Sequence, residues 1–262
     1  MKTKVAINAS SGKMGQQVIN QTVVNKDAEL VAAFCRPNHR LLGRQVGFTD
    51  ISYTSDINTG LANSQVVIDF SLPEATLNLL TIARQTKTPA LIGTTGFNKQ
   101  QIEQITQAAN EIPLLLAPNT SIGVNSVLVL LASAARMLGK KADIEIIESH
   151  HKHKLDAPSG TAIRMGEAIA EAMGENFDDL KVTDSRFEKR SREKGEIGMS
   201  VIRAGEIIGE HKIMFALDNE IINIEHKALN RHCFAEGAVS AAIWLADKPA
   251  GFYTMQDYLA DN

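Results

Sequence analysis

The chain has 262 residues, of which 44% are hydrophobic and 22% charged, and its formal net charge is −3. This composition is typical of a globular protein and excludes a disordered or fibrous one. The slightly negative charge argues against non-specific binding of nucleic acid, which requires a basic face. The length predicts one or two domains.

Cysteine usage and hydropathy bear on location. Cys35 and Cys233 have no paired spacing, so we expect ordinary thiols in a reducing cytoplasm rather than a disulfide framework. The apolar stretch at residues 122–135 contains asparagine and serine and is shorter than the roughly 18 residues that span a bilayer. The N-terminus has no apolar run long enough for a signal peptide. We therefore expect a cytoplasmic protein without a membrane segment.

Short apolar runs alternate with segments of helical periodicity up to residue 117. Strands are predicted at residues 4–7, 29–35, 66–70, 90–93 and 113–117, and helices at 14–24, 74–87 and 99–110. A repeated order of strand and helix predicts a parallel sheet with right-handed crossovers. We expect an α/β fold whose first domain covers residues 1–121.

The pattern changes after residue 122. Helices are predicted at 124–138 and 160–172, and strands at 143–149, 199–204, 211–216 and 220–226. This mixture predicts a second, α+β domain over residues 122–230. A helix at 235–246 lies in a C-terminal segment, 231–262, that we expect to return to the first domain. The charged segment 186–196 is interpreted as a solvated loop.

The turn after the first strand reads Ala-Ser-Ser-Gly-Lys-Met-Gly at residues 9–15. Glycines in such a strand-turn-helix unit let the backbone approach a pyrophosphate at the helix N-terminus. Gly12 and Gly15 have the expected spacing, whereas Ala9 stands where a further glycine is expected. The turn therefore favours dinucleotide binding, with an ordinary tight turn as the alternative. The residues expected to bind the cofactor here are Ser11, Gly12, Lys13 and Met14.

The end of the second predicted strand bears on the choice of nucleotide. Folds that prefer NAD usually carry a carboxylate there for the ribose 2′-hydroxyl, whereas this chain has Cys35 and Arg36. Because Arg36, His39 and Arg40 are close in sequence, a 2′-phosphate is favoured. We predict NADPH as cofactor, with NADH possible. The alternative is that the two arginines are solvated loop charges.

Loops after the later parallel strands are expected to supply further cofactor contacts. Residues 93–96 and 117–120 follow such strands, and ligands bind in the crevice beyond the carboxyl ends of parallel strands. The complete set of additional cofactor-binding candidates is Cys35, Arg36, Gly93, Thr94, Thr95, Ala117, Asn119, Thr120 and Arg231.

The densest group of reactive side chains lies at residues 148–162, which read Glu-Ser-His-His-Lys-His-Lys-Leu-Asp-Ala-Pro-Ser-Gly-Thr-Ala. A basic run that ends at a helix N-terminus is suited to clamp a carboxylate, with charge from Lys154 and N–H groups from Gly160 and Thr161. A histidine there can donate a proton near neutral pH. A small acid is the predicted substrate. Metal binding is disfavoured because adjacent strand residues point to opposite faces, and an exposed polar loop is a further alternative.

This segment resembles the signature of the 4-hydroxy-tetrahydrodipicolinate reductase (dihydrodipicolinate reductase) family of bacterial lysine and diaminopimelate biosynthesis. The similarity covers residues 145–150 and 154–162. Further blocks similar to the family follow the same order along the chain, at residues 69–71, 93–97, 119–125, 203–205 and 226–228.

The resemblance implies a Rossmann-like nucleotide-binding domain, a second α+β domain with a mixed sheet that mediates a homotetramer, and hydride delivery from NAD(P)H to C4 of a small cyclic dicarboxylate. It implies that His150 is the acid/base and Lys154 its catalytic partner. It also implies that His151, Gly160 and Thr161 bind the substrate carboxylates. A reductase of another small cyclic imine or keto acid, and a nucleotide-binding regulatory protein with weakened catalysis, remain alternatives.

Overall fold

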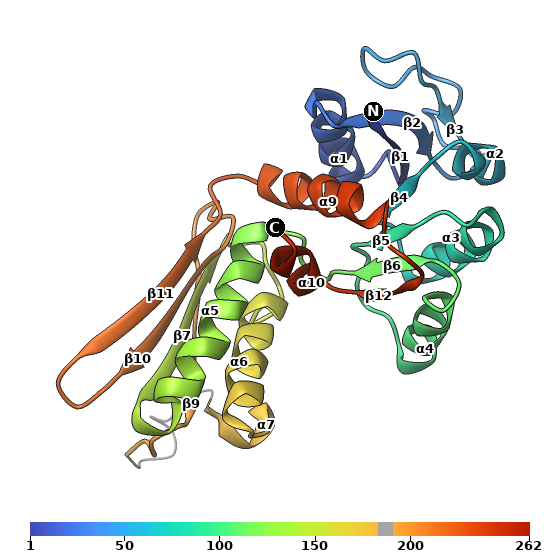
Figure 1. The fold of residues 1–262 in the computed structure, drawn as a ribbon. Coiled ribbons are helices and arrows are strands. Elements are labelled where there is room, and N and C mark those ends of the chain that lie inside the picture. Colours follow the sequence, from blue (N-terminus) through green and yellow to red (C-terminus); the bar gives the residue numbers. More distant parts are fainter. Residues whose placement is uncertain (183–190) are drawn as a thin grey trace. The chain divides into compact units, whose positions relative to one another are not determined.

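The computed structural model describes residues 1–182 and 191–262, and these divide into two compact units. The first unit comprises Met1–Ile122 and His232–Asn262, and the second comprises Gly123–Arg231. Each unit has its own sheet and its own hydrophobic core (Figure 1). The second unit is thus inserted into the chain of the first.

Seven parallel strands form the sheet of the first unit, in the order β12-β6-β5-β4-β1-β2-β3. They are β1 (Thr3–Asn8), β2 (Ala28–Phe34), β3 (Tyr53–Thr54), β4 (Val66–Asp69), β5 (Ala90–Ile92), β6 (Pro113–Leu116) and β12 (Gly251–Tyr253). The order reverses between β1 and β4, which is the switch point where folds of this type bind nucleotides. The predicted α/β, Rossmann-like architecture is confirmed.

Helices cover both faces of this sheet because successive strand residues point to opposite sides. In β1, Val5 and Ile7 enter one core and Ala6 enters the other. The helices are α1 (Lys13–Val24), α2 (Ile57–Ala62), α3 (Pro73–Thr86), α4 (Lys99–Ala108), α9 (His232–Leu245) and α10 (Met255–Ala260). Helices α1 and α9 cover the face of Val5, and α2, α3 and α4 cover the opposite face (Figure 1).

The second unit contains a five-stranded mixed sheet in the order β11-β10-β7-β9-β8. Its strands are β7 (Asp143–His150), β8 (Lys181–Val182), β9 (Ile197–Arg203), β10 (Glu210–Ala216) and β11 (Ile221–Lys227). β9 pairs in parallel with β7 and β8, whereas β10 is antiparallel to β7 and β11. The predicted mixed sheet is therefore confirmed.

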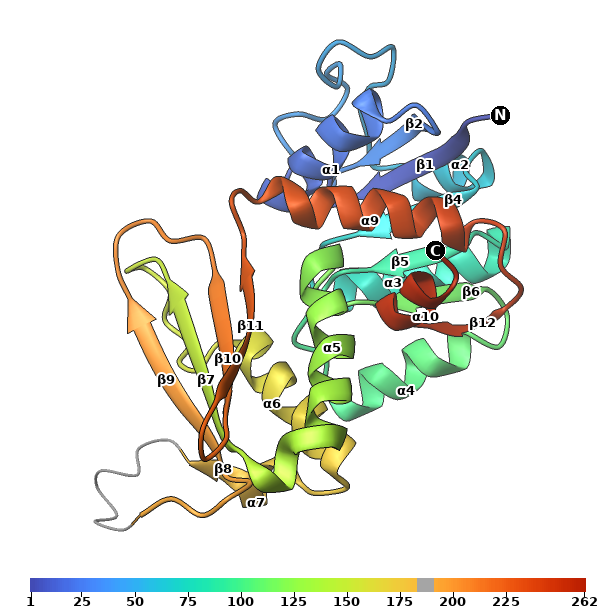
Figure 2. The same ribbon diagram turned by 60° about the vertical axis from the view of Figure 1, so that its left-hand side comes forward.

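Two long helices cover one face of this mixed sheet (Figure 2). The helices of the second unit are α5 (Ile122–Leu138), the short η1 (Gly139–Lys141), α6 (Gly160–Met173) and α7 (Phe177–Leu180). Leu131 of α5 and Ile169 of α6 belong to the same core as Ile146 of β7 and Phe215 of β10. The opposite face of the sheet has no helix over it within the described part of this unit.

The helix Ile122–Lys141 is long and apolar enough, by length and composition alone, to cross a membrane. The helix is longer than the apolar stretch at residues 122–135, because it continues to Lys141. One such helix is weak evidence, since the core helix of a globular unit passes the same test. Here Val124, Leu128 and Leu131 are buried in the core of the second unit, which accounts for the apolar sequence.

The charged segment predicted as a solvated loop at 186–196 lies partly outside the described residues, up to residue 190. From Ser191 onward the chain has no helix or strand until β9, as expected. Arg192 is nevertheless not simply solvated. Its guanidinium donates to a carboxylate oxygen of Glu145 at 2.6 Å and to the carbonyl oxygen of Ile144 at 2.7 Å. This arginine is therefore fixed to the outer face of β7.

Candidate active site

Strand β7 brings two functional side chains to one buried face at its carboxyl end. Its residues alternate strictly between buried and half-buried positions, so Glu148 and His150 share a side. Glu148 is fully buried and His150 is 8% exposed. A carboxylate at such a depth costs free energy unless donors surround it. The contacts of Glu148 are therefore central to this site.

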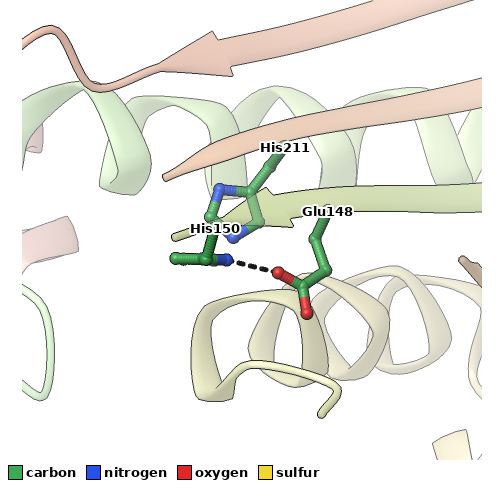
Figure 3. Close-up of side chains that lie close together, drawn as sticks. All are labelled: Glu148, His150 and His211. Atoms are coloured by element: carbon green, nitrogen blue, oxygen red, sulfur yellow. Dashed lines mark hydrogen bonds and ion pairs between the residues drawn. The ribbon is translucent and has the colours of Figure 1, made fainter. Parts of the chain in front are cut away.

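Three donors surround the carboxylate of Glu148. One oxygen accepts from Nδ1 of His150, as Figure 3 shows. The other oxygen accepts from Arg203 at 2.8 Å and from the backbone N–H of Ser159 at 3.1 Å. Burial opposes ionisation, but the hydrogen bonds from Arg203, His150 and Ser159 outweigh it and lower the pKa of Glu148. Glu148 is therefore an anion at neutral pH.

The environment of His150 favours its neutral form. Burial is the largest cause that lowers its pKa, and the charges of Lys154 and Arg203 act in the same direction. The hydrogen bond and charge of Glu148 raise it, so they partly offset burial. Because the ionised carboxylate can only accept, Nδ1 of the neutral ring carries the proton. Nε2 is then the nitrogen whose protonation changes.

A second buried imidazole lies beside the first. His211 of β10 is the cross-strand partner of Glu148, and its ring centroid is 5.3 Å from that of His150 in an edge-on arrangement (Figure 3). Nε2 of His211 is 3.4 Å from the hydroxyl of Ser159. Burial, followed by the nearby His150, lowers the pKa of His211 to about 4. His211 is therefore a neutral group in this network.

The ligand atoms of Glu148, His150 and His211 lie within 4.8 Å of one another, a spacing that a metal ion would also suit. Both carboxylate oxygens, however, already accept hydrogen bonds, and the guanidinium of Arg203 lies 2.8 Å from one of them. A dication would meet that positive charge directly. We interpret the cluster as a hydrogen-bonded network.

The loop after β7 and the start of α6 complete the group of side chains. Lys154 is half-buried and its Nζ lies 2.8 Å from a carboxylate oxygen of Asp156. This hydrogen bond is the main cause that lowers the pKa of Asp156. Arg203 also donates to the carbonyl oxygen of Asp156 at 2.6 Å. The loop is therefore tied to the network of Glu148.

Helix α6 presents its first turn as an anion site. Gly160 and Thr161 are its first two residues, and the hydroxyl of Ser159 caps it by accepting from the N–H of Ala162 at 3.2 Å. A Cβ placed on Gly160 would meet no atom within 4 Å, so the space beside this residue is open. Helix N-termini attract carboxylates through their N–H groups and dipole.

His151 occupies a different position from its neighbour. It is half-buried and follows β7, and its ring centroid lies 6.2 Å from that of exposed His153. Nδ1 of His151 is buried without a hydrogen-bond partner in the part of the chain that the structure describes. The second unit thus contains all five residues predicted for catalysis and substrate binding, as expected from their proximity in sequence: His150, His151, Lys154, Gly160 and Thr161.

In the first unit, a tight turn joins β1 to α1 at the switch point of the sheet. The N–H of Gly12, which caps α1, donates to the carbonyl oxygen of Ala9 at 2.9 Å. A Cβ on Gly15 would lie 2.3 Å from that oxygen, so only glycine fits there. Ala9 has a φ of 49°, in the left-handed region that favours glycine. The closely approaching backbone and the exposed first turn of α1 fit a nucleotide pyrophosphate.

The other predicted cofactor residues of this unit lie at strand ends but differ in exposure. Arg36 is exposed after β2, whereas Cys35 is buried in the core, and burial raises the pKa of its thiol. Thr95 is exposed. Thr94 is buried and its hydroxyl donates to a carboxylate oxygen of Asp69 at 3.2 Å. Of these side chains, Arg36 and Thr95 are the ones that solvent reaches.

The remaining candidates follow β5 and β6 or lie in the second unit. A Cβ on Gly93 would lie 2.1 Å from the ring of Phe70, so this glycine has a packing role. Ala117 is buried and Asn119 is half-buried. The buried hydroxyl of Thr120 donates to the carbonyl oxygen of Phe234 at 2.7 Å. Arg231 is exposed and is the last residue of the second unit.

Sequence reasoning assigned no role to Glu148, Arg203 or His211. The sequence did contain a signal for Glu148: His150 was already a candidate, and residues two apart on a strand share a face. Arg203 and His211 lie on β9 and β10, directly beside β7. Their proximity depends on strand order and register, which periodicity alone does not provide.

Two family models match the chain. "Dihydrodipicolinate reductase, N-terminus" matches residues 3–120, and "Dihydrodipicolinate reductase, C-terminus" matches residues 123–259. Together they account for both units.

Curated relatives and solved structures agree with these matches. The 4-hydroxy-tetrahydrodipicolinate reductases of Polynucleobacter necessarius subsp. necessarius (strain STIR1) and Hahella chejuensis (strain KCTC 2396) are each 43% identical to this chain, over 98% of it and 98% of their own length. A dipicolinate-bound dihydrodipicolinate reductase from Paenisporosarcina sp. TG-14 superimposes with a TM-score of 0.79 and 27% identity, covering 97% of this chain and 98% of that one. The chain belongs to the dihydrodipicolinate reductase family.

Proposed function

We propose that this chain acts as a 4-hydroxy-tetrahydrodipicolinate reductase in which His150 donates a proton and Lys154 stabilises charge and holds a substrate carboxylate. The observation that carries these roles is the pairing of His150 with the ionised, fully buried Glu148, directly before Lys154 and the first turn of α6. A proton donor beside an anion clamp is what reduction of a small unsaturated acid needs.

Each residue meets one requirement of the reaction. When bound, reduced nicotinamide supplies a hydride to C4 of the unsaturated ring. Electron density then moves toward the ring nitrogen, and a nearby cation such as Lys154 lowers the energy of that change. His150 must first take up a proton on Nε2, because its Nδ1–H is held by Glu148, and it is this Nε2 proton that the imidazolium delivers to the substrate. Gly160, Thr161 and His151 bind the carboxylates, and the dipicolinate in the solved relative supports a dicarboxylate heterocycle as substrate.

We assign nucleotide binding to the first unit and a preference for NADPH over NADH to its exposed cations. Arg36 and Arg40 are exposed after β2, and the buried Cys35 offers no carboxylate for a ribose 2′-hydroxyl. Arg36→Ala is expected to lower kcat/KM with NADPH several-fold and to leave kcat/KM with NADH nearly unchanged. Equal losses with both nucleotides would contradict an interaction with the 2′-phosphate.

The experiment that tests the chemical assignment is the replacement of Lys154. Lys154→Ala is expected to lower turnover by roughly 100-fold or more, in line with loss of an electrostatic group at a reacting centre. Nucleotide affinity, measured by fluorescence titration, stays near that of the wild type. Lys152→Ala is the matched control, because Lys152 is an exposed lysine of the same loop. Full activity of Lys154→Ala would remove this residue from the mechanism.

We also propose that the protein acts in the cytoplasm as a homotetramer assembled through the uncovered face of the mixed sheet. Ile202 and Ile221 are 46% and 56% exposed, and strand register places both on the face of Ile147, opposite α5 and α6. Light scattering after gel filtration tests the assembly. A fourfold chain mass for the wild type and a lower mass for Ile202→Lys are expected, whereas a monomeric wild type would contradict the proposal.

A further inference from the structure

We propose that Glu148 is the positioning residue that holds His150 in a single tautomer, and that Gly209 has no side chain because Nε2 of His150 must stay uncovered. This inference rests on the proposed role of His150 as the proton donor. It assigns functions to two residues that themselves need not touch the substrate.

The carboxylate of Glu148 has one available orientation. Its side chain is fully buried, and one oxygen is held from two sides by Arg203 and by the N–H of Ser159. Rotation about the side chain would leave at least one of these buried donors without its acceptor, which is costly. The second oxygen therefore points at His150 and stays there.

A fixed carboxylate fixes the ring. An imidazole in water exchanges its proton between the two nitrogens, and a hydrogen bond at one nitrogen decides which tautomer is present. With Nδ1–H donating to Glu148, Nε2 of His150 is the nitrogen that takes up and releases a proton. The carboxylate also limits ring rotation, so Nε2 keeps one direction.

Gly209 lies directly against this nitrogen. A Cβ on Gly209 would be 3.1 Å from Nε2 of His150 and 3.5 Å from Cδ2 of the same ring. The backbone does not require glycine here, because the φ of Gly209 is outside the left-handed region. The residue is buried, and its carbonyl oxygen accepts from the N–H of Ala228 at 2.9 Å. The proximity of the ring is thus the reason that this position lacks a side chain.

The charges around His150 make Glu148 indispensable for protonation of the ring. The groups that face His150 are Glu148 on its own strand, Arg203 on β9, His211 on β10 and Lys154 in the following loop. Burial and both cations disfavour the protonated ring, and Glu148 is the anion that opposes them. Without the negative charge, the imidazole faces two cations, and its protonated form becomes rarer at any given pH.

The direct test is the tautomer of His150, read from long-range 1H–15N NMR spectra of the intact protein. In the wild type, His150 is expected to show the Nδ1–H tautomer alone. In Glu148→Gln, the Nδ1–H tautomer is expected to lose its dominance.

Glu145→Gln is the matched control, because Glu145 lies on the same strand but pairs with Arg192 and Ser200 on the opposite face. A wild-type ring protonated on Nε2, or a ring unchanged in Glu148→Gln, would overturn the proposal. The wild-type spectrum alone suffices if Glu148→Gln does not fold.

Kinetics separate positioning from general loss of structure. For Glu148→Gln, kcat is expected to fall by roughly 10- to 100-fold with little change in KM. The limb of the pH profile that depends on protonated His150 is expected to move to lower pH. A structural defect would instead lower activity by the same factor at every pH. An unmoved limb, or an equal loss in Glu145→Gln, would contradict the assignment.

Gly209→Ala tests the second half of the inference. The added methyl would lie 3.1 Å from Nε2 of His150, so it covers this nitrogen and the ring must shift by a few tenths of an ångström. We expect kcat to fall at least tenfold, while nucleotide affinity and the dominance of the Nδ1–H tautomer remain those of the wild type. Wild-type turnover in Gly209→Ala would overturn the role of Gly209. His150→Gln separates the proton-donor role of His150 from the fixing of its tautomer by Glu148. Full activity of His150→Gln would overturn the proton-donor role, whereas the NMR result for Glu148 would be unaffected.

Discussion

The side-chain amide of Asn8 donates a hydrogen bond of 2.8 Å to a carboxylate oxygen of Asp69. The two residues are cross-strand neighbours at the carboxyl ends of β1 and β4, and both are buried. Asp69 also accepts from the hydroxyl groups of Thr76 and Thr94. One carboxylate therefore joins β1, β4, the start of α3 and the loop after β5. Asp69 therefore anchors the end of β1, where Ala9 begins the turn that leads to α1.

The strained backbone of Ala9 leads to the first prediction. Relief of a left-handed conformation in a non-glycine residue is worth ~1–2 kcal/mol. The added freedom of glycine in the unfolded chain costs ~0.4–1 kcal/mol. Ala9→Gly is therefore expected to raise the free energy of unfolding by about 0.5–1 kcal/mol, as urea denaturation would show, and to tighten NADPH binding. Ala172→Gly in α6 is the control and should lose stability. A similar loss in Ala9→Gly would mean that the turn stores no strain.

Asn8 provides a second test in the same turn. Asn8→Ala leaves one oxygen of the buried Asp69 without its donor, and an unsatisfied buried group costs ~1–3 kcal/mol. The free energy of unfolding should fall by that amount, and NADPH affinity should fall with it. Lys4→Ala, a substitution elsewhere on β1, should change neither quantity appreciably. Unchanged stability in Asn8→Ala would show that Asp69 does not depend on this amide.

His211 predicts a pH dependence of stability. The folded protein lowers its pKa from 6.5 to about 4, so the unfolded chain binds more protons between these two pH values. Stability from this group is therefore complete above pH 6.5 and is lost as the pH falls toward 4. The contribution is about 3 kcal/mol. His211→Gln should flatten the pH dependence of the free energy of unfolding in this window, whereas exposed His153→Gln should not. An unchanged slope would contradict the neutral, buried state of His211.

The pairing of Lys154 with Asp156 predicts an effect on substrate affinity. Nζ of Lys154 lies 2.8 Å from a carboxylate oxygen of Asp156. If Lys154 holds a substrate carboxylate, as proposed above, that carboxylate must compete with Asp156. Asp156 is 57% exposed in its side chain, and such pairs are worth at most about 1 kcal/mol. Asp156→Asn should therefore lower KM two- to fivefold with little change in kcat, and high salt should reduce the difference. A raised KM would instead give Asp156 a direct part in substrate binding.

Much of the fold was predictable because local patterns determine it. Helices α1, α3 and α6 and strands β1, β4 and β7 begin and end within two residues of the predicted limits. The elements that were not predicted are short: β3 and β8 have two residues each, η1 and β12 three, α7 four, and α2 and α10 six. So few residues show no clear periodicity, and only their neighbours in the sheet or core stabilise them.

The same distinction, between local sequence patterns and long-range contacts, applies to the residues of the candidate site. His150, Lys154, Gly160 and Thr161 lie within a dozen residues, so their types and order were sufficient to single them out. Glu148 owes its importance to Arg203, which comes from a strand that follows 55 residues later and pairs beside β7. Such a contact arises from strand order, and no single window of sequence contains it.

The interleaved order of the two units has a consequence for synthesis of the protein. Helix α9 supplies Ala235, Ala238 and Leu245 to a core of the first unit, and a Cβ on Gly237 would lie 1.9 Å from the carbonyl oxygen of Thr120. The ribosome makes these residues only after the whole of the second unit. The sequence of the inserted unit is complete first, while the face of the seven-stranded sheet that α1 covers in part still lacks α9. A stalled or truncated chain would thus contain a complete second unit and an incomplete first unit. The apolar surface that α9 normally covers would be exposed, and chaperones and proteases could recognise it.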